Sequence, residues 1–359
     1  MSVSFFPEVF YPAGHDPYGI AAADFNADGN MDLAITVISS GDIAVLLGNG
    51  DGTFQGAVFY STGINPTGIV AADFNGDGKI DLATADSNGR DIAVLLGNGN
   101  GTFQVAMGFA AGSNPISIVA ADFNNDGKMD LSVTDLTTDN AVVLLGNGDG
   151  TFRAPIFYSV GNSPYGIASA DFNGDGNIDL AITNNGNSDI AVLLGNGDGT
   201  FKPAVSYSVG DGPSGIVVAD FNGDGKMDLA VSNYDSMNVA VLLGNGDGTF
   251  QNAVFFPIGS NLEGITAADF NGDGKIDLAV AGGNSNSIAI LLGNGNGTFQ
   301  AAQFFTVGNY ASQMVAVDFN NDGKIDLAVT DTFSSDVAVL INNTQMPKPV
   351  RGIPIWDIL

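Results

Sequence analysis

The sequence has no cysteine and a single histidine, His15, among its 359 residues. Without cysteine, neither a disulfide framework nor a thiolate metal site can form. Lysine and arginine together number 10 against 39 acidic residues, which gives a formal net charge of −29. A chain this acidic is repelled by nucleic-acid phosphates and by an anionic membrane surface, so no nucleic-acid partner is expected.

Long apolar runs are also missing. No stretch of about 18 apolar residues occurs, so no membrane insertion is expected. The start of the chain, MSVSFFPEVF, has neither a basic segment nor a long apolar stretch, and it does not resemble a signal peptide. Hydrophobic residues make up 45% of the chain, which is enough for a core, so the acidity does not indicate disorder.

The chain is built from a repeat of 49 residues. Seven copies of the tripeptide Asp-Phe-Asn occur at this spacing, and they begin at Asp24, Asp73, Asp122, Asp171, Asp220, Asp269 and Asp318. The regular spacing predicts a single domain over residues 1–343. Residues 344–359 form a tail outside the repeat that contains the only tryptophan. We expect this tail to be an extended segment, packed on the body or free of it, with a short docking motif as the alternative.

Each repeat contains four short apolar runs. In the second repeat they cover residues 68–74, 80–85, 91–97 and 103–110, and Gly, Asn, Asp or Pro bounds each of them. Runs of this length, rich in β-branched and aromatic residues, indicate strands rather than helices. The third and fourth runs flank GNGNG, whose Asn-Gly pairs suit a tight hairpin turn. Each repeat is therefore predicted to be a four-stranded antiparallel meander.

Seven four-stranded units predict an all-β fold, a seven-bladed β-propeller. Small residues dominate the first run of each repeat, as an innermost strand near the axis requires. The last repeat stops at Asn343 without a fourth strand, and residues 4–14 align one period before residues 54–63. The N-terminal strand should therefore complete blade seven and close the ring. The thirteen Phe of the Asp-Phe-Asn and Gly-Thr-Phe motifs are expected to pack between blades.

An acidic loop with the pattern D-x-N-x-D-G-x-x-D separates the first and second runs of all seven repeats. Alternate oxygen-bearing side chains can point at one centre, and the glycine permits the sharp turn, as in EF-hand calcium loops. The seventh position would contribute its backbone carbonyl. Three carboxylates and an amide form a hard, all-oxygen donor set that favours Ca²⁺. Polar turns without metal are the alternative, but turns alone would not require seven identical donor sets.

The sequence thus predicts about seven calcium ions, one per blade. The predicted ligands are Asp24, Asn26, Asp28, Asn30, Asp32, Asp73, Asn75, Asp77, Lys79, Asp81, Asp122, Asn124, Asp126, Lys128, Asp130, Asp171, Asn173, Asp175, Asn177, Asp179, Asp220, Asn222, Asp224, Lys226, Asp228, Asp269, Asn271, Asp273, Lys275, Asp277, Asp318, Asn320, Asp322, Lys324 and Asp326. The GNGDG hairpins alternate between Asp51 and Asn100 at one position, which is typical of a turn, so no metal is assigned there.

The repeat DFNGDGKIDLAV…IAVLLGNGDGTF resembles the FG-GAP/VCBS repeat of bacterial surface and secreted proteins. It is also similar to the calcium-loop repeats of the integrin α-subunit propeller. The resemblance covers residues 4–343 and implies a seven-bladed propeller with Ca²⁺ in the acidic loops. In this family such propellers serve in adhesion, protein recognition and sugar binding, and some occur beside catalytic domains. No catalytic domain is attached here, so we expect a non-catalytic protein, not an enzyme. Loops of this kind commonly need near-millimolar Ca²⁺, so a secreted or cell-surface location is expected.

Antiparallel topology places the acidic loops and GNGDG hairpins on one face, which is nearly invariant among the repeats. The loops between the second and third runs, and those between repeats, lie on the other face and vary. Unusual residues gather there: His15, Asp16, Tyr18, Arg90, Tyr165, Tyr234, Glu263, Tyr310, Gln313 and Phe333. Of these, we selected Tyr18, Arg90, Tyr165, Tyr234 and Tyr310 as candidate ligand-binding residues, expecting the tyrosines to be exposed.

We expect a monomeric scaffold that binds a glycan or a protein through this variable face. Three alternatives stay open. A strict lectin would carry repeated sugar sites, but the tyrosines occur only sporadically. A polysaccharide-processing enzyme would need paired carboxylates, and the axial strands are expected to offer only small apolar residues. A consensus-like scaffold without a ligand is suggested by the uniform spacing.

Overall fold

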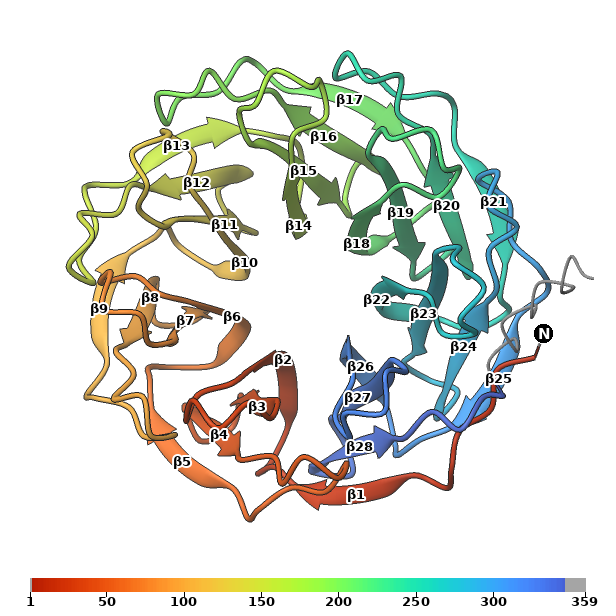
Figure 1. The fold of residues 1–359 in the computed structure, drawn as a ribbon. Helices are drawn as coiled ribbons and strands as arrows, with labels where there is room; N and C mark the ends of the chain where they lie inside the picture. The colour runs from red at the N-terminus through yellow and green to blue at the C-terminus, as the bar shows by residue number, and fades with distance from the viewer. Residues whose placement is uncertain (1, 346–359) are drawn as a thin grey trace, which may run out of the picture.

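The computed structural model describes residues 2–345, and within them 28 strands form seven four-stranded antiparallel sheets arranged as blades of a ring (Figure 1). The strands nearest the axis are β2 (Pro17–Ala23), β6 (Pro66–Ala72), β10 (Pro115–Ala121), β14 (Pro164–Ala170), β18 (Pro213–Ala219), β22 (Leu262–Ala268) and β26 (Ala311–Val317). The second strands are β3 (Asp32–Val37), β7 (Asp81–Asp86), β11 (Asp130–Asp135), β15 (Asp179–Asn184), β19 (Asp228–Asn233), β23 (Asp277–Gly282) and β27 (Asp326–Asp331).

The third strands are β4 (Asp42–Leu46), β8 (Asp91–Leu95), β12 (Asn140–Leu144), β16 (Asp189–Leu193), β20 (Asn238–Leu242), β24 (Ser287–Leu291) and β28 (Asp336–Leu340). The outer strands are β1 (Val9–Pro12), β5 (Val58–Ser61), β9 (Met107–Ala110), β13 (Ile156–Ser159), β17 (Val205–Ser208), β21 (Val254–Pro257) and β25 (Gln303–Thr306). The predicted seven-bladed β-propeller is therefore confirmed. Within residues 2–345, no helix is long and apolar enough to cross a membrane.

The ring closes through the N-terminal strand, as predicted. The sheet of blade seven has the order β1-β28-β27-β26, and β1 pairs with β28 from Val9↔Val339 to Pro12↔Asp336. Next to this seam, the Ser4 amide donates to Thr344 Oγ1 at 3.0 Å. The first and last described segments thus lie side by side. The rest of the predicted tail, residues 346–359, lies outside the described residues.

Phenylalanine side chains join neighbouring blades, as expected from the sequence. The seven Phe of the Asp-Phe-Asn motifs are at most 2% exposed, and the six of the Gly-Thr-Phe motifs are 7–9% exposed. They meet edge to face between blades, with ring centroids 5.5 Å apart for Phe25 and Phe103. The hairpin reinforces this contact, because the Gly101 amide donates to the Phe25 carbonyl at 2.9 Å. Burial of these rings, together with their edge-to-face geometry, stabilises each blade interface.

The inner strands begin earlier than the sequence pattern indicates. The sequence pattern places the first run of the second repeat at residues 68–74, whereas β6 spans Pro66–Ala72. The pairing register shifts between Pro66↔Asp86 and Ile69↔Thr84, which marks a β-bulge. A bulge interrupts the alternation of side chains, so a pattern-based assignment stops at it. As a result, residues assigned to the loops between repeats belong to the axial strands.

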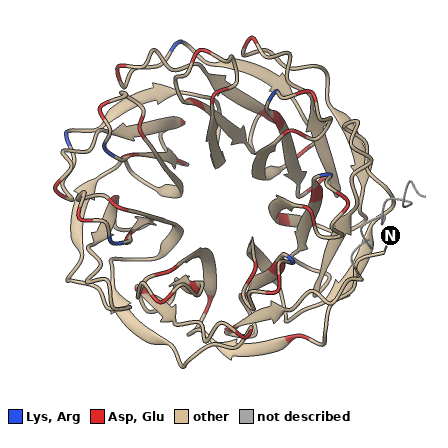
Figure 2. Cartoon of the chain, viewed as in Figure 1, with Lys and Arg blue, Asp and Glu red and all other residues tan. Residues whose placement is uncertain are grey.

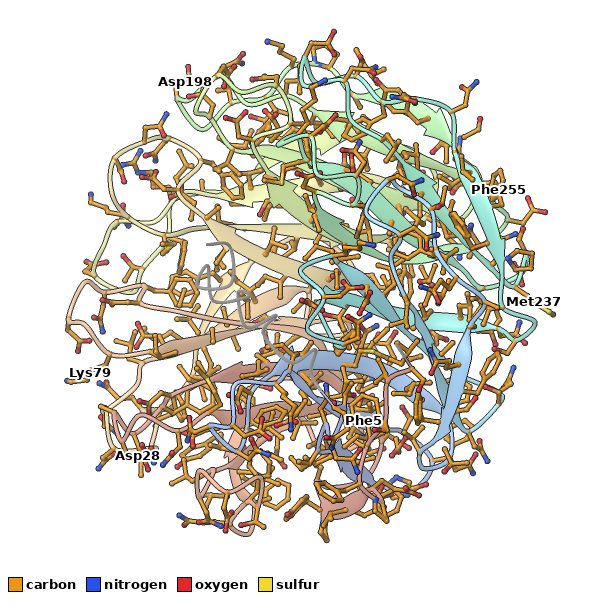
Figure 3. All side chains as sticks on the ribbon, turned by 45° about the vertical axis from the view of Figure 1, so that its right-hand side comes forward. Phe5, Asp28, Lys79, Asp198, Met237 and Phe255 are labelled. Atoms are coloured by element: carbon orange, nitrogen blue, oxygen red, sulfur yellow. The ribbon has the colours of Figure 1, made fainter. Side chains whose placement is uncertain are left out.

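The two faces of the ring carry different loops, as the topology predicted. The acidic loops and GNGDG hairpins share one face, and Asp28, Lys79 and Asp198 lie along that side in Figure 3, with Met237 toward the opposite side. We call the opposite side the variable face. In blade one it consists of loops 38–41 and 62–65, and equivalent loops follow in the other blades.

Candidate functional site

The acidic loops lie between the inner and second strands of all seven blades, and their side chains are held by backbone amides. In blade two, Asp73 Oδ1 accepts from the Gly76 amide at 2.7 Å and Asp73 Oδ2 from the Gly78 amide at 2.8 Å. Asn75 Oδ1 accepts from the Asp77 amide at 2.8 Å. Gly78 has a φ of +80°, which glycine adopts without strain. The sequence motif therefore folds into a tight turn that collects oxygen atoms.

The last aspartate of each acidic loop begins the second strand and is fully buried. Asp81 Oδ2 accepts from the Phe74 amide at 2.9 Å, and Asp81 Oδ1 accepts from the Gly97 amide at 2.7 Å. Burial raises the pKa of Asp81, these two bonds oppose the rise, and the charges of Asp73 and Asp77 add to it. The three carboxylates are thus close enough to interact electrostatically.

The same pattern recurs around the ring. Burial raises the pKa of the equivalent carboxyl to about 6 in Asp32, Asp130, Asp179, Asp277 and Asp326.

The donor set of each loop suits a hard cation, because it offers three carboxylates and an amide without nitrogen or sulfur ligands. In residues 2–345, the side chains do not form a preassembled cluster of three or more His, Cys, Asp or Glu around a metal position. The oxygens instead accept backbone hydrogen bonds, and Lys79 Nζ lies 3.1 Å from Asp77 Oδ2. The loops therefore fit Ca²⁺ by composition, and Ca²⁺ would be held by the side chains predicted from the motif.

A second group of functional candidates lies at the axis, on the side of the variable face. The second residue of each inner strand occupies an equivalent position in the ring, and the seven residues there differ in chemistry. They are Tyr18, Thr67, Ile116, Tyr165, Ser214, Glu263 and Ser312. The only charged side chain in this ring is Glu263.

Four of the predicted tyrosines converge around Glu263. The Tyr18 and Tyr165 hydroxyls hydrogen bond to each other, although they come from blades one and four. The Tyr310 hydroxyl donates to Glu263 Oε1 at 3.0 Å. Tyr234 lies close enough to affect the pKa of both Tyr165 and Tyr310. We call these five residues the axial cluster; it draws on blades one, four, five, six and seven.

Burial and the Glu263 carboxylate control protonation in the axial cluster. Glu263 is 8% exposed, and burial raises the pKa of its carboxyl, opposed by the Tyr310 hydrogen bond. Burial and then the Glu263 charge raise the pKa of Tyr165 to about 12. Burial is also the largest cause that raises the pKa of Tyr18 and of Tyr310 well above the usual value. Tyr18, Tyr165 and Tyr310 are therefore neutral donors and acceptors at ordinary pH.

A cavity of about 170 Å³ opens at the axis beside this cluster. Tyr18, Tyr165 and Gln313 line it together with apolar residues of the inner strands, such as Ile20 and Ile167. The axial channel thus carries polar, aromatic side chains at the variable face and isoleucines around it. This differs from the expectation that the axial strands provide only small apolar residues.

The structure separates the five selected ligand candidates. Tyr18 and Tyr165 lie on β2 and β14, and Tyr234 and Tyr310 lie in loops of blade five and before blade seven. All four are partly buried rather than exposed. Arg90 lies apart from them, exposed in the loop of blade two.

Glu263 is not among the ligand candidates predicted from the sequence, although it is one of the unusual residues of the variable face. Comparing positions 49 residues apart on the inner strands would have identified it as the only charge in the ring. Two other unusual residues have neighbours of their own. Phe333 packs on Tyr310 at a centroid distance of 4.7 Å, and His15 Nδ1 lies 3.1 Å from Asp16 Oδ1.

Comparison with known proteins places the chain in a family. The FG-GAP-like repeat matches residues 34–84, 73–133, 131–182, 171–231, 220–280 and 269–329. The chain therefore belongs to the FG-GAP-like repeat family. No curated protein matches the sequence.

Several solved structures share the fold at low identity. A lectin from Agrocybe aegerita that recognises non-reducing terminal N-acetylglucosamine is 20% identical, with a TM-score of 0.56 and 80% of each chain covered. A virginiamycin B lyase from Staphylococcus aureus is 16% identical, with a TM-score of 0.65 and coverage of 95% of this chain and 99% of the lyase. A periplasmic gluconolactonase from Pseudomonas aeruginosa is 15% identical, with a TM-score of 0.63 and coverage of 83% and 86%.

The prediction that the protein is not an enzyme is wrong, because it rested on the fold and this fold also occurs in enzymes. The structural relatives include a lyase and a gluconolactonase as well as a lectin. A propeller without an attached catalytic domain can therefore be an enzyme. The argument from the axial strands fails too, because Tyr18, Tyr165 and Glu263 lie on them. Identities this low show the common fold alone.

Proposed function

We propose that this propeller is a ligand-binding protein that recognises a glycan or a protein through its variable face, with Ca²⁺ bound in the acidic loops of the opposite face. The observation that carries the proposal is the convergence of Tyr18, Tyr165, Tyr234 and Tyr310 around the buried Glu263. These side chains come from separate blades, and two of them, Tyr18 and Tyr165, line an open cavity at the axis. Aromatic rings with polar tips are suited to sugar and protein contacts.

The variation among blades supports this location. The acidic loops keep the same donors in all seven repeats, whereas the ring that contains Tyr18, Tyr165 and Glu263 combines two Tyr, three Ser or Thr, one Ile and one Glu. A repeated structural role would favour the same residue at each position. The lectin relative gives a precedent for a glycan ligand on this fold.

The proposal includes a secreted or cell-surface location and a monomeric state. Calcium loops of this kind commonly bind with affinities suited to the near-millimolar Ca²⁺ found outside cells. The lack of cysteine is compatible with such a setting, since the closed ring and the calcium loops would supply stability without disulfides.

Binding to a glycan array and to a panel of surface proteins, in buffer with millimolar Ca²⁺, tests the proposal. We expect at least one ligand, and we expect Tyr310→Ala and Tyr234→Ala to weaken its binding about tenfold, the loss typical of an important aromatic contact. Phe255→Ala is the matched control, because Phe255 is an aromatic residue, 48% exposed, on the outer strand β21.

Two results would contradict the proposal. The first is the absence of any ligand in both panels, which would favour a scaffold without a ligand. The second is a bound ligand whose affinity depends on Phe255 and not on the two tyrosines, which would move the site from the variable face to the outer rim.

A further inference from the structure

We infer that the axial cluster binds a primary ammonium group, with Glu263 as its anionic anchor. This inference rests on the proposed binding function and names the ligand chemistry of the same site. The ammonium group can belong to an amino sugar or to a lysine side chain, and both present the same three N–H donors.

The first argument is that the Glu263 carboxylate is buried and has few hydrogen-bond donors. Its side chain is 8% exposed, and within residues 2–345 its only hydrogen-bond donor is the Tyr310 hydroxyl on Oε1. A buried carboxylate normally has several donors or a cation beside it, since taking it out of water is costly. Oε2 thus has bonding capacity that the described residues do not use.

The second argument is the lack of a compensating cation. In the part of the chain that the structure describes, no Lys, Arg or His side chain forms an ion pair with Glu263. Arg90 is the only lysine or arginine in the loops of the variable face, and it belongs to blade two. Figure 2 shows few basic residues in a molecule with acidic ones in every blade. The field at the site therefore attracts positive charge.

The third argument is hydrogen-bond polarity. The Tyr310 hydroxyl uses its proton on Glu263, so its oxygen can only accept from a further partner. In the Tyr18–Tyr165 pair one hydroxyl likewise donates to the other, so the donating oxygen can only accept from a further partner, while the second hydroxyl still has its proton to donate. Oε2 of Glu263 and the Tyr310 oxygen thus form an acceptor pair, which the hydrogen bond between the two residues holds together. An ammonium group, which has donors only, matches it better than a hydroxyl or an amide.

Calorimetric titration of the full chain with two amines and their acetylated forms tests this inference. The amines are glucosamine and Nα-acetyl-lysine methylamide, and the neutral controls are N-acetylglucosamine and Nα,Nε-diacetyl-lysine methylamide. We expect at least one amine to bind at least tenfold more tightly than its neutral counterpart. The amine that binds more tightly identifies the source of the ammonium group.

A pair of charge-removing variants locates the binding. Glu263→Gln should reduce amine affinity about tenfold or more, because a charge-assisted bond is lost. Asp235→Asn removes the same charge from an exposed loop residue of the variable face and should change affinity less than twofold. Melting curves of both variants check that they are folded.

The titrations on the unmodified protein test the ammonium inference even if Glu263→Gln does not fold. Binding of both neutral forms as tightly as their own amines, or the failure of both amines to bind, would overturn the inference. Equal losses in Glu263→Gln and Asp235→Asn would also overturn it, because general attraction would then explain the affinity. If a neutral ligand binds and Tyr310→Ala weakens it, the proposed function stands while the ammonium inference fails.

Discussion

Two aspartates face each other across β7 and β8, and the Thr84 hydroxyl donates to Asp86 Oδ1 at 3.0 Å. Asp86 pairs in register with Asp91, and Asp86 Oδ2 and Asp91 Oδ1 are buried without a hydrogen-bond partner. Burial is the main cause that raises the pKa of Asp86 to about 7, with the charge of Asp91 as a further cause. In blade four the equivalent carboxylate has a donor, because Asn184 Nδ2 donates to Asp189 Oδ1 at 2.8 Å, although Asn184 Oδ1 has no partner.

Replacing Asp86 with Asn should stabilise the protein at alkaline pH. The raised pKa means that the folded state binds this proton more tightly than the unfolded chain, so stability falls as pH rises from 3.8 toward about 7. At pH 8 the buried Asp86 carboxyl is ionised in the folded protein, and the cost of this buried charge is fully present. At this pH Asp86→Asn should raise the free energy of unfolding by about 1–3 kcal/mol. The gain should shrink at pH 5. Urea unfolding at both pH values, with Ca²⁺ fixed, measures it.

The reverse change in blade four provides the control. Asn184→Asp places a second carboxyl beside Asp189 and should lower stability at pH 8 more than at pH 5. A gain from Asp86→Asn that is the same at both pH values would show that protonation of this residue is not its cause.

At the scale of the element, the closing strand β1 can be compared with an ordinary outer strand. Tyr11 on β1 packs edge to face on Phe54 with a centroid distance of 5.5 Å, and Tyr60 on β5 packs on Phe103 at the same distance. The two contacts are equivalent, although only β5 is joined to its blade by a hairpin. The closure of the ring is therefore noncovalent but reproduces the contact of an ordinary blade.

We expect Tyr11→Ala and Tyr60→Ala to lower the free energy of unfolding by similar amounts, about 2–4 kcal/mol each, through lost burial of the ring. Denaturant unfolding of both variants measures the two losses. A much smaller loss for Tyr11→Ala would show that β1 detaches before the rest of the ring unfolds.

The strands and their order could be predicted from the sequence because every repeat has the same four apolar runs, separated by the same kinds of turn. Glycine-rich turns bound every run, and the missing fourth strand of the last repeat matches residues 4–14. The start of the inner strands could not be predicted, since the bulge before Ile69 and its equivalents breaks the alternation. The sequence pattern therefore predicts loops at Tyr18 and Tyr165.

The axial cluster depends on three-dimensional geometry that no local pattern encodes. Tyr18 and Tyr165 are 147 residues apart and meet only because seven blades bring their inner strands around one axis. The sequence showed that both were unusual, but it could not show that they share a site with Glu263. The predicted calcium ligands, by contrast, can be recognised in the local sequence, because each loop contains its whole donor set within nine residues.

At the scale of the whole molecule, the negative charge is concentrated in the acidic loops. Each of the seven loops has three aspartates, which together make up 21 of the 39 acidic residues. Seven bound Ca²⁺ ions would change the formal net charge from −29 to −15. Binding would thus relieve repulsion within each loop and between neighbouring loops.

Chelation of Ca²⁺ should lower the melting temperature strongly. At free Ca²⁺ about tenfold above Kd, each site would stabilise the fold by roughly 1.4 kcal/mol, and seven sites by roughly 10 kcal/mol. This is comparable to the net stability of about 5–15 kcal/mol of a typical domain. Calorimetric melting with and without excess EDTA measures the effect. An unchanged melting curve would contradict calcium binding.

Two single substitutions provide a matched control for this experiment. Asp77→Asn removes one carboxylate from a predicted calcium site and should reduce the response of the melting temperature to Ca²⁺. Asp51→Asn makes the same change in a GNGDG hairpin, where Asn100 already occupies the equivalent position of the next repeat, and should leave that response unaltered.

Because the seam beside Ser4 and Thr344 closes the ring, any of the seven blades could come first along the chain. The chain ends of the described structure meet at hydrogen-bond distance, with Asn343 N donating to the Ser4 carbonyl at 3.0 Å. A short linker there, combined with a cut in another loop between blades, would give a circularly permuted chain with the same set of contacts. The blade that comes first along the chain could therefore be changed without changing which blades are neighbours around the axis.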